Sequence, residues 1–597
     1  MCGIVGYTGH REAYPVLLNG LERLEYRGYD SCGVAVQTPQ GILVSKDTNS
    51  VEALRNQAAD LRGHIGIGHT RWATVGTPTL ANAHPHLDCH AGVAIVHNGD
   101  IDNFLELRDR LREQGHRFSS DTDSEVLAHL IESYSEEGPV GGVVRALRDV
   151  EGSYALVAMY RDSGMLVAAR RESPLVIGLG EGEQIVASDV PGVIESTPRV
   201  AYLEDGDVAQ LTPEGIQVAH NGIPARRSVH QINWRPQDMG KAGYDHYFLK
   251  EVHEGPRVIR DTLAGKIAST EPGVALQPDL MGLGQPSRIM LSGCGTAYHA
   301  GLLAGEFYAQ LSSCDVTVGV ASELEYLRPA DSRSWGIFIS QSGETADTIS
   351  AARLARNSGR FTIGVTNTPN SSLSRVMDAT LETRAGLETS VASSKTFLAQ
   401  VVDLYLLGLS LFPPSIDRLH DMLTELRFLP ARVQRVLGME DRLREIGRML
   451  APAQHVYLIA KGINYPVALE GALKLKELAY LHAEGYPAGE LKHGPFAMLT
   501  EETPVIALVP KDRTFTRVLN SVKEIRARGA PVIAITDTDD DTVASLVNET
   551  VRLPATDPLF FPVISAVALH LVAYYCALER GCPIDRPRNL AKSVTVH

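Results

Sequence analysis

Short apolar runs separated by turn residues fill about the first 230 positions of the chain. Glycine, asparagine and aspartate interrupt these runs, and segments with the apolar spacing of a helix lie between them. The strand-like runs are 33–36, 93–96, 154–159 and 166–169, and the helical patterns are 11–23, 103–113 and 124–133. Strands and helices mixed in this way predict an α+β sandwich.

The rest of the chain alternates strand and helix patterns, and this alternation occurs twice. Apolar strands at 288–291, 336–339 and 362–366 are followed by a second set at 455–459, 505–509 and 532–536. Leu291 pairs with Leu458, Phe338 with Ala507 and Val365 with Ile535, at offsets of 167, 169 and 170 residues. A near-constant offset predicts two copies of one doubly wound α/β unit, with chance alignment of apolar strands as the alternative.

A polar stretch at 226–243 separates the two patterns and carries Pro236, Gly240 and Gly243. We therefore predict a domain at 1–230, a linker at 231–244, two α/β units at 245–425 and 426–586, and a tail at 587–597. The most apolar stretch, 560–578, contains Pro562 and His570. We interpret it as a buried helix rather than a membrane span.

Composition and charge narrow the possible partners. With 44% hydrophobic and 21% charged residues, the chain is neither disordered nor fibrous in type. The net charge of -15 argues against nucleic acid, although a helix N-terminus can still hold one small phosphate. Seven scattered cysteines are not a disulfide framework, and no secretory signal begins the sequence. We expect a cytoplasmic protein.

Cys2 is a candidate nucleophile. Removal of Met1 would leave a free α-amine, with a pKa of about 8, beside the thiol. Asn98 and Gly99 follow an apolar strand and offer a side-chain amide and a backbone N–H to an oxyanion. Arg71 could bind an α-carboxylate and Asp123 an α-ammonium. Separately, these residues are also typical of an Asn-Gly turn, a surface arginine and a helix cap.

Together these residues resemble the N-terminal-nucleophile glutamine amidotransferases, whose fold is an αββα sandwich. The similarity lies in Met-Cys-Gly-Ile at the start and in the segments 24–31, 69–74 and 97–99. The resemblance implies Cys2 as nucleophile, Asn98 and Gly99 as oxyanion hole, and a set of glutamine ligands. That set is Arg71, Thr74, His84 and Asp123.

The chain departs from this family's pattern at a few positions. Val75 replaces the histidine that usually follows the threonine of the arginine motif, and Asp100 and Asp102 replace the usual Ile and Glu. The segment 84–90, which contains three histidines and Cys89, could be mistaken for a metal site. It lacks paired CxxC or HxxxH spacing and no second ligand cluster is evident, so we expect no metal. The family uses this region to shape the glutamine pocket.

The strand at 336–339 leads into Ser340-Gln341-Ser342-Gly343-Glu344-Thr345 and then a helix. Hydroxyls and free backbone N–H groups at such a turn can hold a phosphate, although simple helix capping is the alternative. The string resembles the phosphate loop of the sugar isomerase (SIS) domains, and 294–296 and 392–395 resemble their sugar-binding loops. Ala297 and Ser394 depart from the family's usual Ser and Thr. The implied sugar-phosphate ligands are Cys294, Gly295, Thr296, Ser340, Gln341, Ser342, Thr345, Val391, Ser393 and Glu470.

Glu470, Lys474 and Glu477 lie on one face of a predicted helix. The alternative to a site is a solvated ladder of salt bridges, but the helix is apolar around most of its girth. A partly buried glutamate beside a lysine suits proton transfer, and His493 offers a second acid or base. The segment 588–597 carries Lys592, which would ordinarily be a solvated terminal residue.

Over its whole length the chain resembles the glutamine-dependent sugar-phosphate aminotransferases. The resemblance implies transfer of glutamine nitrogen to fructose 6-phosphate, which gives glucosamine 6-phosphate for amino-sugar (UDP-GlcNAc) synthesis. It implies ring opening by His493, a Schiff base on Lys592, C1-to-C2 proton transfer by Glu477 and support from Lys474. It also implies no cofactor, no membrane, a homodimer, and an ammonia channel gated by Trp72, for which a core aromatic residue is the alternative.

Three other functions are alternatives to this one. A phosphoribosyl-type amidotransferase would lack the duplicated unit and the Lys592 tail, and is rejected. A sugar-phosphate sensor without catalysis conflicts with the presence of Cys2, Glu477 and Lys592. A specialised copy with altered inhibitor sensitivity or acceptor stays open because of Val75, Asp100 and Ala297.

Overall fold

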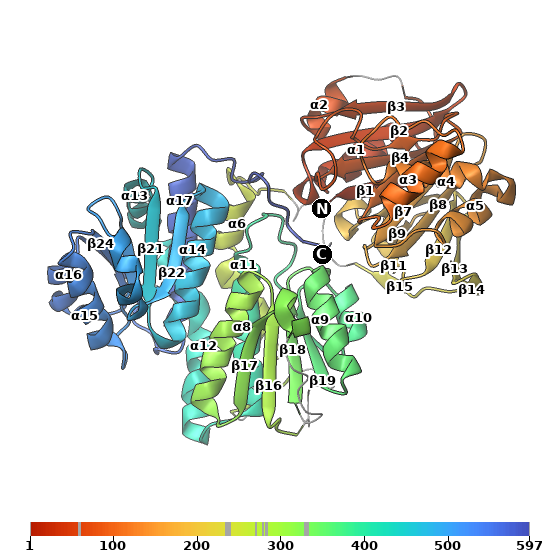
Figure 1. Cartoon of the computed structure of the whole chain (residues 1–597). Coiled ribbons are helices and arrows are strands. Elements are labelled where there is room, and N and C mark those ends of the chain that lie inside the picture. Colours follow the sequence, from red (N-terminus) through yellow and green to blue (C-terminus); the bar gives the residue numbers. More distant parts are fainter. Residues whose placement is uncertain are drawn as a thin grey trace. The chain divides into compact units, whose positions relative to one another are not determined.

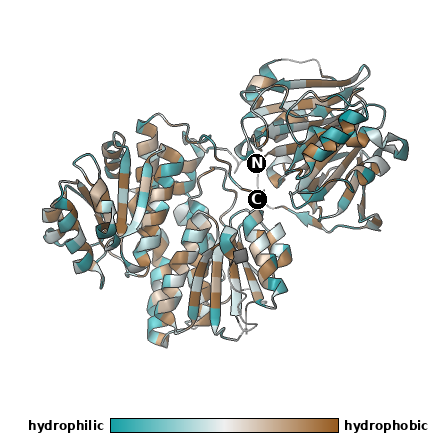
Figure 2. Ribbon diagram, in the orientation of Figure 1, coloured by the Kyte–Doolittle hydropathy of each residue, from teal (hydrophilic) through white to brown (hydrophobic). Residues whose placement is uncertain are grey.

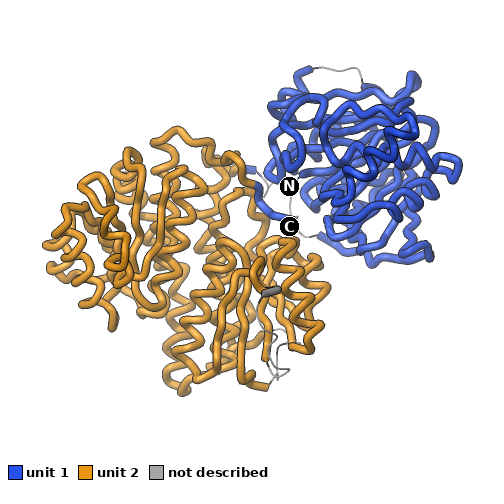
Figure 3. Tube along the Cα trace, in the orientation of Figure 1, with its two compact units in different colours: residues 1–240, 591–597 blue, residues 241–590 orange. Residues whose placement is uncertain are grey.

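The computed structural model describes residues 2–57, 61–232, 240–268, 272–276, 280, 284–326 and 334–595. The chain forms two compact units, Met1–Gly240 with Ala591–His597 (unit 1) and Lys241–Leu590 (unit 2) (Figure 3). Half of the predicted linker, including Pro236, and the last two residues of the predicted tail lie outside the described residues.

Within the described part of unit 1, two antiparallel sheets pack face to face (Figure 1). The first has the order β15-β11-β9-β10-β1-β4-β2-β3, with strands Val229–Gln231, Arg199–Tyr202, Val176–Leu179, Glu183–Ala187, Gly3–Gly9, Ile65–Arg71, Ser31–Thr38 and Gly41–Asp47. The second has the order β14-β13-β12-β8-β7-β6-β5, with strands Ile223–Ala225, Gly215–His220, Asp207–Thr212, Leu166–Arg171, Tyr154–Tyr160, Val93–Asn98 and His86–Leu87.

Helices cover the outer faces of both sheets, so unit 1 is an αββα sandwich as predicted. They are α1 (Ala13–Glu22), α2 (Val51–Asn56), α3 (Phe104–Glu113), α4 (Glu125–Ser133) and α5 (Gly138–Ala146). The apolar faces of α1 and α4 pack on β1 and β6, while the outward face of α3 is polar (Figure 2). Apolar side chains from both sheets, such as Ile4, Ile67, Val96 and Val157, fill the layer between them.

Unit 2 repeats one parallel five-stranded sheet within its described residues. The first sheet has the order β17-β16-β18-β19-β20, with strands Asp315–Val320, Arg288–Gly293, Ser334–Ser340, Phe361–Thr366 and Ala379–Glu382. The second has the order β22-β21-β23-β24-β25, with strands His482–Pro487, His455–Ala460, Val505–Leu508, Val532–Thr536 and Glu549–Arg552. In both, the first strand in the sequence lies between the second and the third. The predicted duplication is confirmed.

Twelve helices of the described residues surround these two sheets. They are α6 (Tyr247–His253), α7 (Gly255–Leu263), α8 (Thr296–Leu311), α9 (Ala346–Asn357), α10 (Ser372–Val376), α11 (Lys395–Leu411), α12 (Ile416–Leu437), α13 (Glu440–Leu450), α14 (Tyr465–Ala479), α15 (Phe515–Arg526), α16 (Asp541–Leu546) and α17 (Phe561–Glu579). Helix α17 is long and apolar enough to cross a membrane, with a mean hydropathy of 1.8, but 94% of that window is buried. It packs against α13 and α14 as a core helix, as the sequence predicts.

Candidate functional site

The register of β1 against β4 places Cys2 beside the arginine motif. Gly3 lies opposite Thr70 in this antiparallel pair, so Cys2 lies next to Arg71 and Trp72 at the end of β4. The backbone N–H of Trp72 donates to Cys2 Sγ at 3.3 Å. Asn98 reaches the same point from β6 of the other sheet, and its Nδ2 donates to the carbonyl of Cys2 at 3.0 Å.

These residues line one pocket in unit 1. Its lining is Cys2, Arg71, Trp72, Thr74, His84, His97, Asn98, Gly99, Thr122, Asp123, Ser124 and Thr595. The structure therefore brings together every residue that the resemblance implied for glutamine hydrolysis and binding. Thr122, Ser124 and Thr595 are additions that the sequence analysis did not name.

His69, which the sequence analysis did not single out, fixes the direction of the Asn98 amide. His69 Nε2 lies 3.0 Å from Asn98 Oδ1 and 3.0 Å from the carbonyl of His97. Both neighbours are acceptors, so the ring proton belongs on Nε2. Burial lowers the pKa of His69 to about 3, which keeps the ring neutral. The nitrogen of the Asn98 amide therefore faces Cys2.

Gly99 has a backbone that a side chain would disrupt. Its φ is +123°, and a Cβ there would lie 2.2 Å from the carbonyl of Ser153. This conformation follows directly after β6, next to Asn98, and belongs to glycine. Gly99 is thus suited to present its backbone to the pocket.

The arginine of the pocket also holds the loop that follows it. Arg71 donates to the carbonyls of Val75, Gly76 and Thr77. The contact at Val75 uses its backbone and is compatible with any side chain. The substitution of the family's histidine by valine therefore leaves this part of the loop anchored.

Asp123 lines the pocket, and Asp100 directly follows Gly99 of the same lining. Asp123, just before α4, accepts from the backbone N–H of Ile101 at 3.0 Å. Burial, followed by repulsion from Asp123 and Asp102, raises the pKa of Asp100. The Asp100 carboxyl therefore resists ionisation more than a free aspartate does, beside the residue expected to bind the α-ammonium of glutamine.

In unit 2, the predicted phosphate loop lies where the strand order reverses. β16 and β18 are neighbours in the first sheet, and their following loops, 294–296 and 340–345, meet at the carboxyl edge. Ligands of doubly wound folds bind at this point. Ser340 Oγ lies 2.8 Å from Thr345 Oγ1 and accepts the backbone N–H of Gly343 at 3.1 Å. The hydroxyls thus gather at the start of α9, as predicted for a phosphate site.

A buried glutamate, Glu388, holds the loop that was predicted to bind sugar phosphate. Glu388 accepts from Ser393 Oγ at 2.9 Å and from the backbone N–H groups of Ser394 and Thr396 at 2.9 and 3.0 Å. These bonds fix the turn that precedes α11, where Val391 and Ser393 were predicted to bind sugar phosphate. No motif in the sequence singled out Glu388.

The predicted Glu470–Lys474–Glu477 face is a buried ionic network and not a solvated ladder. Glu470 and Lys474 are both 0% exposed, and Lys474 Nζ contacts Thr296 Oγ1 at 3.0 Å as well as both glutamates. Burial opposes ionisation of Lys474, but the Glu470 and Glu477 carboxylates outweigh it and raise its pKa. Glu477 stays partly accessible, with 21% of its side chain exposed.

Two histidines complete the surroundings of Glu470. His299 Nδ1 lies 2.8 Å from Glu470 Oε2, and His570 Nε2 lies 3.7 Å from Glu470 Oε1. Burial disfavours the charge on Glu470, but Lys474 and these rings hold its pKa well below the ordinary value. Sequence reasoning missed both histidines.

His493 and Lys592 are the two remaining predicted catalytic residues. His493 ends the short helix Glu490–His493 of unit 2 and is exposed. Lys592 is half-buried in the segment Ala591–His597, which groups with unit 1. Joint action of Glu477, His493 and Lys592 on one substrate stays a prediction.

Comparison with known families matches both halves of this description. A glutamine amidotransferase domain matches residues 48–222, and the SIS domain matches residues 282–410 and 449–580. The class of protein is therefore a glutamine amidotransferase joined to a pair of SIS domains.

Relatives share this arrangement over their full length. Glutamine–fructose-6-phosphate aminotransferase (isomerizing) of Thermus thermophilus is 43% identical, and that of Methanosarcina acetivorans 41%, each over 100% of both chains. The C-terminal domain of glucosamine-fructose-6-phosphate aminotransferase from Francisella tularensis is 32% identical, with a TM-score of 0.55, over 58% of this chain and 99% of that one. The chain belongs to the glutamine–fructose-6-phosphate aminotransferase (isomerizing) family.

Proposed function

We propose that this chain converts L-glutamine and D-fructose 6-phosphate into L-glutamate and D-glucosamine 6-phosphate. The observation that carries the proposal is the convergence of Cys2, Asn98 and Arg71 on one pocket, in a family member that also has the Thr296–Glu470–Lys474 network. In the proposed division, residues 1–230 hydrolyse glutamine, 245–425 and 426–586 bind and isomerise the sugar, and 587–597 form a catalytic tail.

Glutamine hydrolysis would begin at Cys2. After removal of Met1, the α-amine takes the thiol proton, and the thiolate attacks the carboxamide carbon. Asn98 and Gly99 hold the oxyanion, the C–N bond breaks, and ammonia leaves with a proton. Water then releases glutamate from the thioester. Arg71 and Asp123 bind the two charged ends of the amino acid.

Sugar amination would proceed on the open-chain ketose. His493 assists ring opening, and Lys592 forms a Schiff base with the C2 ketone, with loss of water. Ammonia displaces Lys592 at C2 and leaves a ketose imine. Glu477 then carries a proton from C1 to C2 while the C1 hydroxyl proton passes to the imine nitrogen, which gives the amino aldose. The buried Lys474 orients Glu477, and Trp72 gates ammonia. None of these steps requires a metal or an organic cofactor.

We further propose a cytoplasmic homodimer that uses neither membrane nor nucleic acid. None of the seven cysteines, all in the described part of the chain, is joined in a disulfide, which suits a reducing compartment. His493 is exposed. In a dimer formed through the isomerase domains, it could therefore reach the sugar site of the second copy.

The test is to incubate the purified chain with glutamine and fructose 6-phosphate and to measure glutamate and glucosamine 6-phosphate separately. We expect equal yields in the wild type. Cys2→Ala should lose both products, and Lys592→Ala should lose the amino sugar. The exposed Lys523→Ala is the matched control.

Two outcomes would contradict the proposal. If the wild type forms glutamate but no glucosamine 6-phosphate, the acceptor of ammonia is not fructose 6-phosphate. The absence of both products would favour a sugar-phosphate sensor without catalysis.

A further inference from the structure

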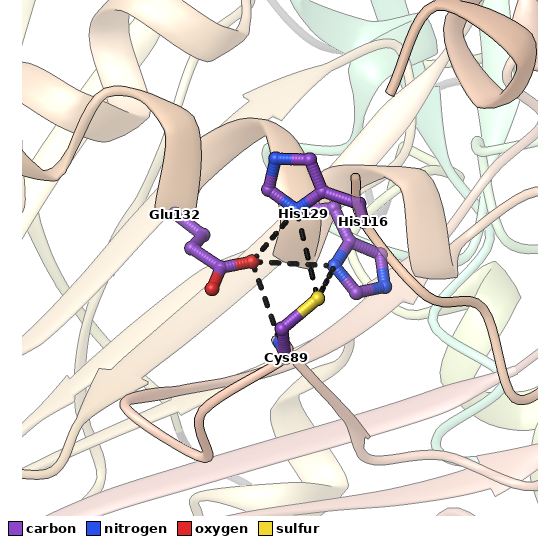
Figure 4. Close-up of side chains that lie close together, drawn as sticks. All are labelled: Cys89, His116, His129 and Glu132. Carbon is purple, nitrogen blue, oxygen red and sulfur yellow. Dashed lines mark hydrogen bonds and ion pairs between the residues drawn. The ribbon is translucent and has the colours of Figure 1, made fainter. Parts of the chain in front are cut away.

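Four side chains of unit 1 converge away from the glutamine pocket (Figure 4). Cys89, His116, His129 and Glu132 each direct one ligand atom to a common point, and these four atoms all lie within 4.8 Å of one another. None of the four is among the residues that line the glutamine pocket.

Three different elements supply the four side chains. Cys89 lies in the turn between β5 and β6, and His116 follows α3. His129 and Glu132 lie one turn apart on α4, so both point to the same side of that helix. The cluster could not be predicted from the spacing around Cys89, because the other three ligand residues lie 27 to 43 positions further along the chain.

Two of the following four donor separations match a tetrahedral metal site, one is slightly longer, and the His116–Glu132 pair lies closer, at hydrogen-bond length. Cys89 Sγ lies 3.7 Å from His116 Nδ1 and 3.5 Å from His129 Nδ1. Glu132 Oε2 lies 2.9 Å from His116 Nδ1 and 3.4 Å from His129 Nδ1. A tetrahedral Zn²⁺ with ordinary bond lengths to sulfur, nitrogen and oxygen separates its ligands by roughly 3.3–3.6 Å.

We propose that Cys89, His116, His129 and Glu132 form a structural Zn²⁺ site. A thiolate, two imidazole nitrogens and a carboxylate are ligands that Zn²⁺ accepts, and four protein ligands close its coordination sphere. His129 is 1% exposed, whereas Cys89 is exposed and leaves a path for the ion.

The surrounding hydrogen bonds orient these ligands for a metal. Ser133 Oγ donates to the carbonyl of His129 at 2.9 Å and lies 3.1 Å from His116 Nε2. Its single hydrogen cannot serve both, so His116 Nε2 must carry a proton and donate. A bound ion would displace the proton that Nδ1 shares with Glu132 Oε2 and leave the ring in the tautomer that metal-bound histidines use.

The thiolate and the carboxylate are supported in the same way. The backbone N–H of Arg117 donates to Cys89 Sγ at 3.4 Å. His90 Nδ1 lies 2.6 Å from Glu132 Oε1, the oxygen that points away from the cluster. Such outer contacts fix ligands before the ion binds.

The consequence for the enzyme is mechanical. The ion would join the turn after β5 to α4. His84, shortly before β5, and Asp123 and Ser124, just before α4, all line the glutamine pocket. A bound Zn²⁺ therefore braces two walls of that pocket without contacting the reactants.

Cobalt substitution tests the site independently of catalysis. The full chain is stripped with a chelator, titrated with Co²⁺ alone, and then with Zn²⁺ against a chromogenic chelator. We expect one ion per chain, the visible bands of tetrahedral Co²⁺ and a sulfur-to-cobalt charge-transfer band. The Cys89→Ser variant should lose the charge-transfer band and bind Zn²⁺ at least about 100-fold more weakly.

Two controls separate this site from other thiols and from misfolding. Cys2→Ala and Cys314→Ser should keep the ion and its spectrum. Since Cys89 is exposed, Cys89→Ser should keep the wild-type circular dichroism. Substoichiometric metal in the wild type, or a charge-transfer band that survives Cys89→Ser but disappears in Cys2→Ala, would overturn the proposal.

Discussion

Asn98 can present its amide nitrogen to Cys2 because His69 holds the oxygen of the same side chain. If this nitrogen stabilises the oxyanion, its contribution appears in the transition state and not in glutamine binding. Asn98→Ala should lower kcat for glutamate formation by about 10²- to 10³-fold and change KM little. Steady-state glutaminase kinetics check this. A fall confined to KM would assign Asn98 to substrate binding instead.

His69 should also make the free energy of unfolding depend on pH. The pKa of His69 is about 3 in the folded chain and about 6.5 in the unfolded chain. Between these pH values, the His69 ring is protonated in the unfolded chain and neutral in the folded chain. Its contribution is full above about pH 6.5 and is lost as pH falls toward 3, by at most about 1.4 kcal/mol per pH unit.

The substitution His69→Gln should therefore flatten the pH dependence of unit 1 between pH 6.5 and 5. Urea unfolding at several pH values measures the free energy, with the exposed His10→Gln as control. Equal slopes in wild type and His69→Gln would show that His69 is protonated in the folded chain.

At the scale of elements, the turn after β6 depends on Gly99 in two ways. Alanine there meets both a strained φ and a carbonyl at 2.2 Å, whereas Gly115, with φ +97°, has open space around its Cα. Gly115→Ala should cost about 1 kcal/mol of stability from backbone strain. Gly99→Ala should cost more and abolish glutaminase activity. Equal losses of Tm in the two variants would show that the contact with Ser153 relaxes.

Helix α14 depends on its buried charges being paired. Lys474→Met leaves Glu470 charged and without its cation in the core, which should cost about 3–5 kcal/mol in the unfolding of unit 2. The double variant Lys474→Met, Glu470→Gln should recover part of that loss because no charge remains buried there. Denaturant unfolding of both variants checks this. No recovery would mean that Lys474 acts mainly through Glu477.

Elements with strong apolar runs were predictable from the sequence, and the others were not. The strands at 154–159 and 336–339 and the helix at 124–133 were found because burial imposes their pattern. Strands β17 and β22 are the edges of their sheets and partly exposed, so no apolar run marks them.

The same limit applies to the sites. Motif residues such as Cys2, Asn98 and Glu470 were predictable, but the residues that hold them by hydrogen bonds were not. His299 reaches Glu470 across 171 residues and His69 reaches Asn98 across 29, and no local spacing records such contacts. Folding alone brings these pairs together.

For the whole molecule, two compact units imply two partly independent unfolding events. Calorimetry should show two transitions. A glutamine analogue that modifies Cys2 should raise the Tm of one transition, and fructose 6-phosphate should raise the Tm of the other by a few degrees. A ligand at 100 times its Kd adds about 2.7 kcal/mol to the free energy of unfolding. Cys2→Ala is the control for the analogue. Equal shifts of both transitions by either ligand would show one cooperative unit.

Helix α17 gives unit 2 a particular order of assembly during synthesis. It follows every strand of both parallel sheets in the sequence, yet its residues Phe561–Ala577 are all buried against helices made earlier. Until α17 leaves the ribosome, the apolar faces of α13 and α14 have no cover. A nascent chain that stops before residue 560 therefore leaves the apolar faces of α13 and α14 exposed to solvent, and an exposed surface of this kind promotes aggregation.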